Sequence, residues 1–381
     1  MIRISDKSLC CGCTACATVC PAQCIVLRRD REGFDYPVAN PDLCISCGKC
    51  EKVCPMQQTP EPSETTAVYA VRSEAHLRES SSGGVFPVIA GKMIEEGGVV
   101  FGAVLEPDKR VAHYEASTVE ELQKMRGSKY AQSDLYSTFE DISYYLKSGQ
   151  KVLFSGTPCQ VAGLLNSLGG SQENLLTVDF ACHGVPSPGL WEKYVKALET
   201  RTGSPLKGVK FRDKSEGWRH YCFRYDDVSV PYIDDPYMAL FVQDMSIRPS
   251  CYNCRFRAEG SGSDLRLADL WSVSLAAPEF DDDRGVTAVF VNTGKGAAAL
   301  DELKKAADVK QIDEKLAKED NGGYAAVIAV PEKREEFFKG VHSAKDLVAY
   351  MSTYVKRRPL HIRIYRSVRK RLSQLKRRII K

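Results

Sequence analysis

The sequence has no long apolar segment. No run of about 18 or more apolar residues occurs in its 381 residues, so nothing in it has the pattern of a transmembrane helix. The opening residues, Met1 to Asp6, lack the apolar core of a secretory signal peptide. We therefore expect a cytoplasmic protein, and peripheral attachment to the inner face of the membrane is considered below for the C-terminal tail.

Two common nucleotide-binding fingerprints are also missing. The chain contains neither GxGxxG nor the P-loop pattern GxxxxGK followed by Ser or Thr. A conventional dinucleotide-binding fold and a P-loop NTPase therefore lose support, because both rely on those glycines to bring the backbone against phosphates.

Acidic residues are absent from the last stretch of the chain. Residues 356–381 hold twelve Lys or Arg and no Asp or Glu, so with a net charge of +4 overall the preceding residues carry 4 − 12 = −8. Nucleic-acid binding begins with phosphate neutralisation by clustered cations, so an acidic body makes a general nucleic-acid surface unfavourable.

Cysteine, in contrast, is abundant. A chain without an export signal holds 15 cysteines, which indicates metal ligation because cytosolic thiols are kept from pairing. Eight of them form two runs with the same spacing, CxxCxxCxxxCP: Cys10, Cys13, Cys16 and Cys20 before Pro21, then Cys44, Cys47, Cys50 and Cys54 before Pro55.

This repeat predicts two 4Fe-4S clusters in residues 1–60. The short spacings wrap one loop around three corners of a cubane, while the remote fourth cysteine binds the other cluster. We assign one cluster to Cys10, Cys13, Cys16 and Cys54 and the second to Cys44, Cys47, Cys50 and Cys20. Zinc ribbons and disulfides are the alternatives, but zinc sites use cysteine pairs rather than quartets ending in Cys-Pro. Cys11, Cys24 and Cys222 receive no role.

The rest of the chain alternates between apolar strands and helical patterns. Residues 57–66 are polar and contain proline, which indicates a linker, and the larger region that follows is divided at residues 67–150 and 151–340. Strands are predicted at 99–105, 151–154 and 175–180, and helices at 85–94, 161–168 and 190–198. The predicted architecture is α+β or α/β: a ferredoxin-like domain followed by a larger α/β domain.

Four further cysteines follow strands or form a pair. Cys159 and Cys182 come after predicted strands, where α/β sheets place ligands, and Cys251 and Cys254 form a CxxC pair. A third metal site, a redox-active pair and simple buried thiols all remain open on spacing alone. Cys182 and His183 are not expected to form a nucleophile and base, because neighbours on an extended strand point to opposite faces.

A serine-glycine turn precedes the helix predicted at 85–94. Ser80 to Gly84 could hold a phosphate at the helix N-terminus, or could simply cap the helix.

Taken together, six segments resemble the coenzyme F(420) hydrogenase/dehydrogenase beta-subunit family. They are SSGG at 81–84, GSKY at 127–130, SGTPCQ at 155–160, CHGVPS at 182–187, CYNC at 251–254 and SDLRLADLW at 263–271. The resemblance spans roughly residues 67–275, behind the ferredoxin repeat.

This resemblance implies a flavin, commonly FAD, and a larger domain that binds it. It implies a third 4Fe-4S cluster on Cys159, Cys182, Cys251 and Cys254, and flavin contacts from Ser82, Gly83, Gly84, Lys129 and Tyr130. A flavin would suit a relay because it exchanges hydride on one side and single electrons on the other.

We therefore expect a flavin-dependent iron-sulfur oxidoreductase that passes electrons between a ferredoxin or other redox protein, its clusters and a small organic or deazaflavin substrate. The alternatives are a non-catalytic electron-transfer subunit of a larger complex, in a family some of whose members accompany surface-polysaccharide synthesis, and a membrane-associated scaffold.

The tail at residues 356–381 predicts a basic amphipathic helix. Leu360, Ile364, Val368, Leu372, Leu375 and Ile379 recur at spacings of three and four with cations between them. Such a helix could lie on an anionic membrane, dock on the acidic body or a partner, or meet RNA.

Overall fold

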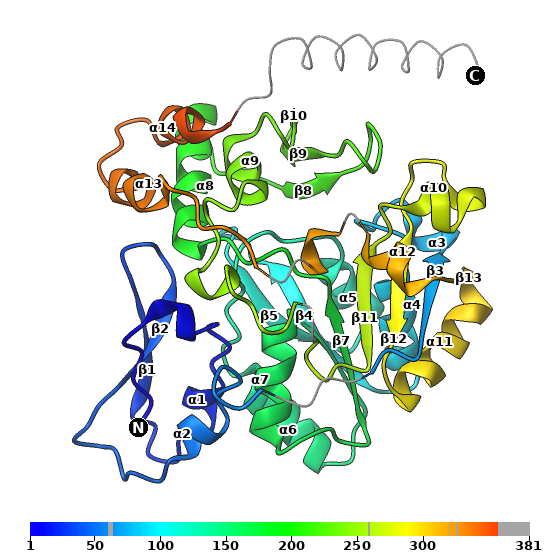
Figure 1. Ribbon diagram of the computed structural model, residues 1–381, viewed down its shortest axis with the longest axis horizontal. Helices are drawn as coiled ribbons and strands as arrows, with labels where there is room; N and C mark the ends of the chain where they lie inside the picture. The colour runs from blue at the N-terminus through cyan, green and yellow to red at the C-terminus, as the bar shows by residue number, and fades with distance from the viewer. Residues whose placement is uncertain (60–63, 258–259, 320, 325–326, 357–381) are drawn as a thin grey trace.

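The computed structural model describes residues 1–381 except 60–63, 258–259, 320, 325–326 and 357–381. Figure 1 shows the N-terminal domain beside a large mixed sheet, with a smaller lobe of sheet and helices next to both. The predicted tail helix falls outside the described residues, apart from Lys356. Among the described helices, none has the length and apolarity needed to cross a bilayer.

The N-terminal domain repeats its backbone as well as its cysteines. Its elements are η1 (Lys7–Leu9), α1 (Ala15–Thr18), α2 (Lys49–Lys52) and the antiparallel strands β1 (Ile25–Arg29) and β2 (Asp35–Ala39). Gly12 and Ser46, at matching places in the two runs, have φ values of 73° and 53°, and Thr14 and Gly48 have 63° and 71°. These left-handed residues curl each loop back on itself, so that its cysteines face inward.

The large sheet has eight strands in the order β13-β3-β12-β11-β7-β6-β4-β5. Its parallel centre is β4 (Val99–Leu105), β6 (Val152–Ser155), β7 (Leu175–Phe180) and β11 (Leu265–Asp269). The antiparallel flanks are β5 (Val111–Ala116), β12 (Thr287–Val291), β3 (Ala67–Arg72) and β13 (Asp308–Ile312). The α/β expectation is thus correct for the centre, and the flanks make the sheet mixed.

Helices cover both faces of this sheet because successive strand residues point to opposite sides. On one face, α4 (Val85–Glu95), α5 (Val119–Met125) and α11 (Gly294–Ala306) pack on a core that includes Val100 and Leu153. On the other, α6 (Thr138–Lys147) and α7 (Pro158–Leu168) pack on Phe101 and Phe154, together with Cys13 of the N-terminal domain. The N-terminal domain therefore completes one face of the sheet.

A second lobe is built around aromatic side chains. It contains the sheet β10-β9-β8, made of β8 (Val209–Asp213), β9 (Cys222–Tyr225) and β10 (Val228–Pro231), with α8 (Pro188–Thr202), α9 (Pro236–Val242), α13 (Arg334–Val341) and α14 (Leu347–Tyr354). Trp191 lies at its centre, against Phe211 and Tyr237. The remaining short helices are α3 (Glu74–Leu77), η2 (Pro249–Cys251), α10 (Val273–Ala276), η3 (Pro278–Phe280), α12 (Glu314–Lys318) and η4 (Gly322–Tyr324).

The β1–β2 turn fastens the N-terminal domain to this lobe. Gly33 lies so close to Gly189 that a Cβ on Gly189 would come 2.7 Å from the Cα of Gly33, and Gly189 donates a 3.1 Å hydrogen bond to the Gly33 carbonyl. Next to it, Glu32 forms a bidentate pair with Arg334 at 2.6 and 2.7 Å. The domain is therefore held by packing and by an ion pair, at the start of α8 and on α13.

Candidate functional site

The four cysteines Cys10, Cys13, Cys16 and Cys54, here called the inner quartet, line one cavity that opens to solvent and has about 380 Å³ of empty space, its mouth included. The cavity walls are otherwise mostly apolar, with Ile2, Ile4, Leu27, Pro37 and Met56 among them. Burial raises the pKa of the Cys16 thiol to about 12, so a metal must take the place of the proton for this thiol to become a thiolate. The donor set and the cavity suit a cubane cluster.

The cysteines Cys20, Cys44, Cys47 and Cys50 form the outer quartet, which reaches solvent at one of its members while Cys50 is buried. Cys47 is exposed, and the sulfur of Cys50 accepts a 3.3 Å hydrogen bond from the Ile2 amide. Cys24 lies between members of this quartet: its sulfur is 3.5 Å from that of Cys20, and the charges of both Cys20 and Cys44 act on it. The structure thus brings Cys20 to the second run, as the exchanged fourth ligand requires.

The third quartet, Cys159, Cys182, Cys251 and Cys254, comes from three separate elements. Cys159 lies in the first turn of α7, Cys182 two residues beyond β7, and Cys251 and Cys254 on the loop that begins with η2. The charge of each of the other three acts on the Cys182 thiol, so the four converge, although desolvation is the main reason that the pKa of Cys182 lies well above its ordinary value. The spacing left this site open, and the fold brings its members together.

A buried ion pair holds the loop that carries Cys251 and Cys254. Arg266 on β11 binds Asp179 on β7 through two hydrogen bonds of 2.8 and 2.9 Å. The same guanidinium donates to the carbonyls of Phe256 and Arg257, just after Cys254. The position of the CxxC loop is therefore set by the parallel centre of the sheet.

His183 follows Cys182 and contacts Asp244. Its Nε2 lies 2.9 Å from Oδ1 of Asp244, and its ring packs edge-on against Phe241. The residue lies past the end of β7 rather than on it, so the expectation based on strand geometry does not apply here. These two contacts give the imidazole a structural place in the fold.

The inner quartet and the third quartet meet on α7. Gly163 has no side chain because Cys13 occupies that place: a Cβ there would lie 2.8 Å from the Cys13 sulfur. Cys159 is four residues earlier on the same helix, hence on the same face one turn away. The buried thiol of Cys11 lies near the thiols of both Cys13 and Cys159. The two quartets are therefore neighbours.

The serine-glycine turn is used for packing. Gly83 donates to Oγ1 of Thr287 at 2.9 Å and leaves no room for a side chain against the β3 and β12 backbones, while Ser82 donates to the Val286 carbonyl at 3.0 Å. Gly84 is the N-cap of α4. The turn also meets the second predicted segment, since Oγ of Ser81 accepts a hydrogen bond of 2.7 Å from the Ser128 amide.

Lys129 and Tyr130 lie beside this turn. The Lys129 ammonium donates to the last carbonyls of α5, those of Lys124, Met125 and Arg126, and desolvation lowers its pKa to about 7. The Tyr130 ring packs on Phe241 with a centroid distance of 4.8 Å. Both residues are therefore engaged within the chain, at the same place as the Ser81 to Gly84 turn.

Arg212 on β8 carries two donors that lack a hydrogen-bond partner among the described residues. Its side chain is 4% exposed and pairs with Asp269 at 2.6 Å, while Nε and Nη2 are buried and meet no acceptor in that part of the chain. Its guanidinium lies over the rings of Tyr221 and Trp271. Lys214, two residues along, donates to the carbonyl of Ser82 at 3.0 Å, so Arg212 belongs to the same region as the serine-glycine turn.

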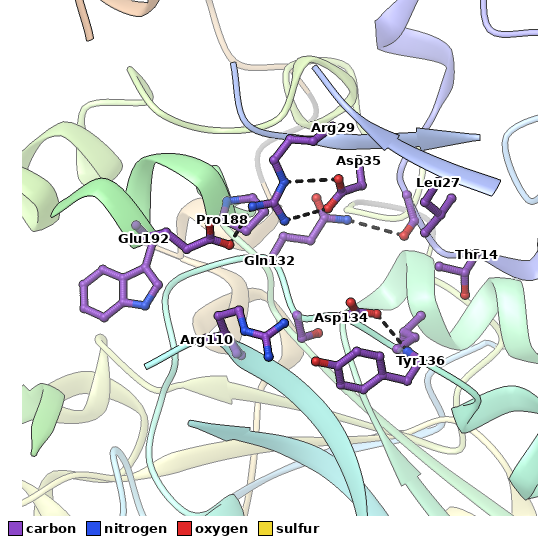
Figure 2. Close-up of a pocket in the computed structure, with 15 residues that line it drawn as sticks. Thr14, Leu27, Arg29, Asp35, Arg110, Gln132, Asp134, Tyr136, Pro188 and Glu192 are labelled. Carbon is purple, nitrogen blue, oxygen red and sulfur yellow. Dashed lines mark hydrogen bonds and ion pairs between the residues drawn. The ribbon is translucent and has the colours of Figure 1, made fainter. Parts of the chain in front are cut away.

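Figure 2 shows a surface pocket of about 600 Å³ beside the inner quartet. It lies between the β1–β2 hairpin and the start of α8 and shares Gly12, Thr14 and Leu27 with the inner cavity. Arg29 spans it, bonded to Asp35 at 2.9 Å and to Glu192 at 2.6 Å. Because Arg29 pairs with Glu192 of α8, the pocket lies at the interface between the N-terminal domain and the second lobe.

Within the described residues, no group of three or more His, Cys, Asp or Glu side chains is arranged to hold a single metal ion. A cubane has four iron corners, so its ligands need not converge on one point.

Comparison with known proteins gives two family matches. Residues 9–58 match the model described as a 4Fe-4S dicluster domain, and residues 149–315 match the one that describes the C terminus of the coenzyme F(420) hydrogenase/dehydrogenase beta subunit. The chain is therefore similar to that family over residues 149–315, behind a 4Fe-4S domain. The chain is an iron-sulfur electron-transfer subunit of the oxidoreductase type, related to those beta subunits.

Among solved structures, a chain of the F(420)-reducing NiFe hydrogenase complex from Methanosarcina barkeri is similar at 17% identity. The similarity covers 75% of this chain and 96% of that one, with a TM-score of 0.48. No curated protein matches.

Sequence reasoning missed Arg248 and Arg212 as residues of these sites. Arg248 immediately precedes the Pro-Ser-Cys that begins the CxxC loop, which was the one local signal for it. Arg212 had none, because its partners Asp269 and Trp271 are far along the chain.

Proposed function

We propose that the three quartets each hold a 4Fe-4S cluster and that the chain relays electrons between a redox protein and a flavin. The outer quartet accepts electrons from a ferredoxin-like partner because its Cys47 is exposed. Bound clusters would supply one-electron transfer, and a flavin would couple it to two-electron chemistry on a small organic or deazaflavin substrate.

The observation that carries this proposal is the contact between Cys13 and Gly163. It places the inner quartet one helical turn from Cys159, the first member of the third quartet. A ferredoxin domain that did not pack on α7 would not require a glycine there. The close packing supports delivery of electrons from the N-terminal domain into the large domain.

Flavin binding is proposed at Ser82, Gly83, Gly84, Lys129 and Tyr130, beside Arg212. The two N–H donors that Arg212 leaves buried without acceptors support it, because a buried donor is costly unless a ligand pairs with it. A flavin carries both phosphate and carbonyl oxygens that accept from a guanidinium.

The test is the cofactor content of anaerobically purified protein. Three cubanes predict about twelve irons per chain, together with one flavin released by acid. Replacing Cys251 and Cys254 with Ser should remove about four irons. Cys222→Ser is the matched control, because Cys222 is a buried thiol outside all three quartets, and it should keep them all. Eight irons in the unmodified protein would reject the third cluster.

The flavin is tested separately with Arg212→Met. We expect flavin content to fall while iron content stays unchanged. Arg219→Met is the control, because Arg219 lies nearby on the surface and pairs with Asp281 and Asp283. Iron without flavin in the unmodified protein would instead favour a non-catalytic electron-transfer subunit.

A further inference from the structure

Arg248 is a buried cation between the inner and third quartets. Its residue is 1% exposed, and it lies three positions before Cys251. Its Nε donates to the Cys10 carbonyl at 2.7 Å, and its Nη2 lies 3.5 Å from the Cys10 sulfur. One guanidinium thus contacts a member of the inner quartet from the loop that carries the third.

The other partners of Arg248 are neutral. It donates to Oε1 of Gln132 at 2.8 Å and to the Asp35 carbonyl at 2.9 Å, and it lies 4.3 Å from the centroid of the Tyr36 ring. In the described part of the chain no carboxylate pairs with it. Burying an unpaired charge is costly, so the thiolate of Cys10 is the group that can compensate it.

The charge of Arg248 does not depend on pH. A guanidinium keeps its proton throughout the physiological range, so its charge at this place is permanent.

The two cysteine runs differ at the residue that admits this guanidinium. At Gly12 a Cβ would lie 2.7 Å from Nη1 of Arg248, so only glycine leaves space for it. The matching residue of the second run is Ser46, which has a similar backbone conformation. The repeat has therefore diverged where Arg248 enters, and only the first run is adapted to a cation.

We propose that Arg248 is a positioning residue that raises the reduction potential of the inner cluster above that of the outer cluster. The inference rests on the proposed function, because it takes Cys10 as a cluster ligand. Reduction adds one electron and one negative charge to the cluster, and a fixed positive charge beside a ligand sulfur stabilises that state. Electron flow from the outer quartet to the inner one, toward α7, is then favoured.

The experiment is a redox titration of the anaerobic holoprotein followed by electron paramagnetic resonance. Arg248→Met should lower the equilibrium constant for reduction of the inner cluster at least tenfold, which is 59 mV for one electron. The outer cluster should titrate as before. Arg248→Lys keeps the charge and should recover most of the difference, and Arg28→Met, an exposed control on β1, should change nothing. Repeating the titration with Cys47→Ser, which removes the outer cluster, and with Cys251 and Cys254 replaced by Ser, which removes the third, identifies the inner signal.

The outcomes separate this inference from the proposed function. An Arg248→Met protein with full iron content and an unchanged inner potential would overturn the role of Arg248 and leave the relay intact. Full iron content in Cys10→Ser would instead overturn the ligand assignment. If Arg248→Met loses the inner cluster, Arg248→Lys and Arg248→Gln are compared instead. A lower reduction potential of the inner cluster in Arg248→Gln than in Arg248→Lys supports the inference, and equal potentials reject it.

Discussion

The inner and outer quartets share one spacing but differ in their surroundings. Cys10 and Cys13 are buried against α7 and Arg248, whereas Cys47 is exposed and its neighbours Leu43 and Ile45 are exposed as well. An internal repeat can therefore supply two similar cofactor sites, and the rest of the fold then makes them different. One is adapted to meet a partner and the other to meet the large domain.

The largest test of this comparison is to remove one ligand from each quartet. Cys13→Ser and Cys47→Ser should each lose about four irons. Only Cys13→Ser should also lower the melting temperature markedly, because the proposed inner cluster would fill a cavity whose wall residues Cys13 and Met56 pack on the large domain. Iron analysis and thermal unfolding under anaerobic conditions measure both effects. Equal melting temperatures in the two variants would contradict a structural difference between the quartets.

The ion pair of Glu32 and Arg334 tests how strongly the β1–β2 hairpin is held against α13. Arg334→Met leaves a largely buried carboxylate unpaired and should cost about 3 kcal/mol in the free energy of unfolding. The matched control is Arg201→Met, whose exposed pair with Asp346 should contribute no more than about 1 kcal/mol. Denaturant unfolding measures both. Similar losses in the two variants would mean that the hairpin turn is not fixed by this pair.

Acid should weaken the sheet edge beside the inner and third quartets. Desolvation lowers the pKa of His113 on β5 to about 4, and its ring contacts the Ser155 carbonyl just before α7. Below pH 6.5 the imidazole takes up a proton in the unfolded chain but not in the folded chain. The free energy of unfolding therefore decreases as the pH is lowered from 6.5 to 4. At pH 5 the loss is (6.5 − 5) × 1.36, or about 2 kcal/mol.

Hydrogen exchange at pH 7 and pH 5 measures this effect. Amides of β5 and β6 should lose protection at pH 5 in the native protein, and His113→Gln should show a smaller change with pH. The same loss in both proteins would show that another group is responsible.

The smallest expected effect comes from a single methyl group. The added Cβ in Gly163→Ala would press on the Cys13 sulfur, and this overpacking destabilises the fold. The better helix propensity of Ala offsets part of the loss, so the free energy of unfolding should fall by about 1 kcal/mol. Gly91→Ala on α4 is the control, because open space surrounds it and the gain in propensity should stabilise the fold by up to about 1 kcal/mol. A stabilised Gly163→Ala protein would contradict close docking on α7.

Three central strands and the cysteine repeat could be predicted from the sequence because their signals are local. Strands β4 and β7 have the predicted bounds, and β6 differs by one residue at each end, since buried parallel strands are short apolar runs. The fourth central strand, β11, the flanking strands β3, β5, β12 and β13 and the lobe sheet were not predicted. Asp308–Ile312 and Val209–Asp213 mix charged with apolar residues, which hides the strand pattern.

The contacts that make the quartets unequal could not be predicted. Arg248 and Cys10 are 238 residues apart, and Arg334 and Glu32 are 302 apart, so no window of sequence joins them. Cys11 is similar: the spacing rule excludes it as a ligand, and only the fold shows that it lies between two quartets. Local patterns specified the ligands, and the approach of distant segments specified their surroundings.

The facing glycines at the β1–β2 turn have a consequence for protein engineering. The backbones of Gly33 and Gly189 are in direct contact, and Glu32 next to Gly33 pairs with Arg334. The N-terminal domain therefore docks on the second lobe only if its hairpin has this turn. A two-cluster ferredoxin grafted in its place would carry the same type of cofactor. It would not dock on the second lobe unless its hairpin had a Glu-Gly sequence at that turn. Exchange of such modules between relatives is therefore limited by one turn of the hairpin, which contains no cysteine.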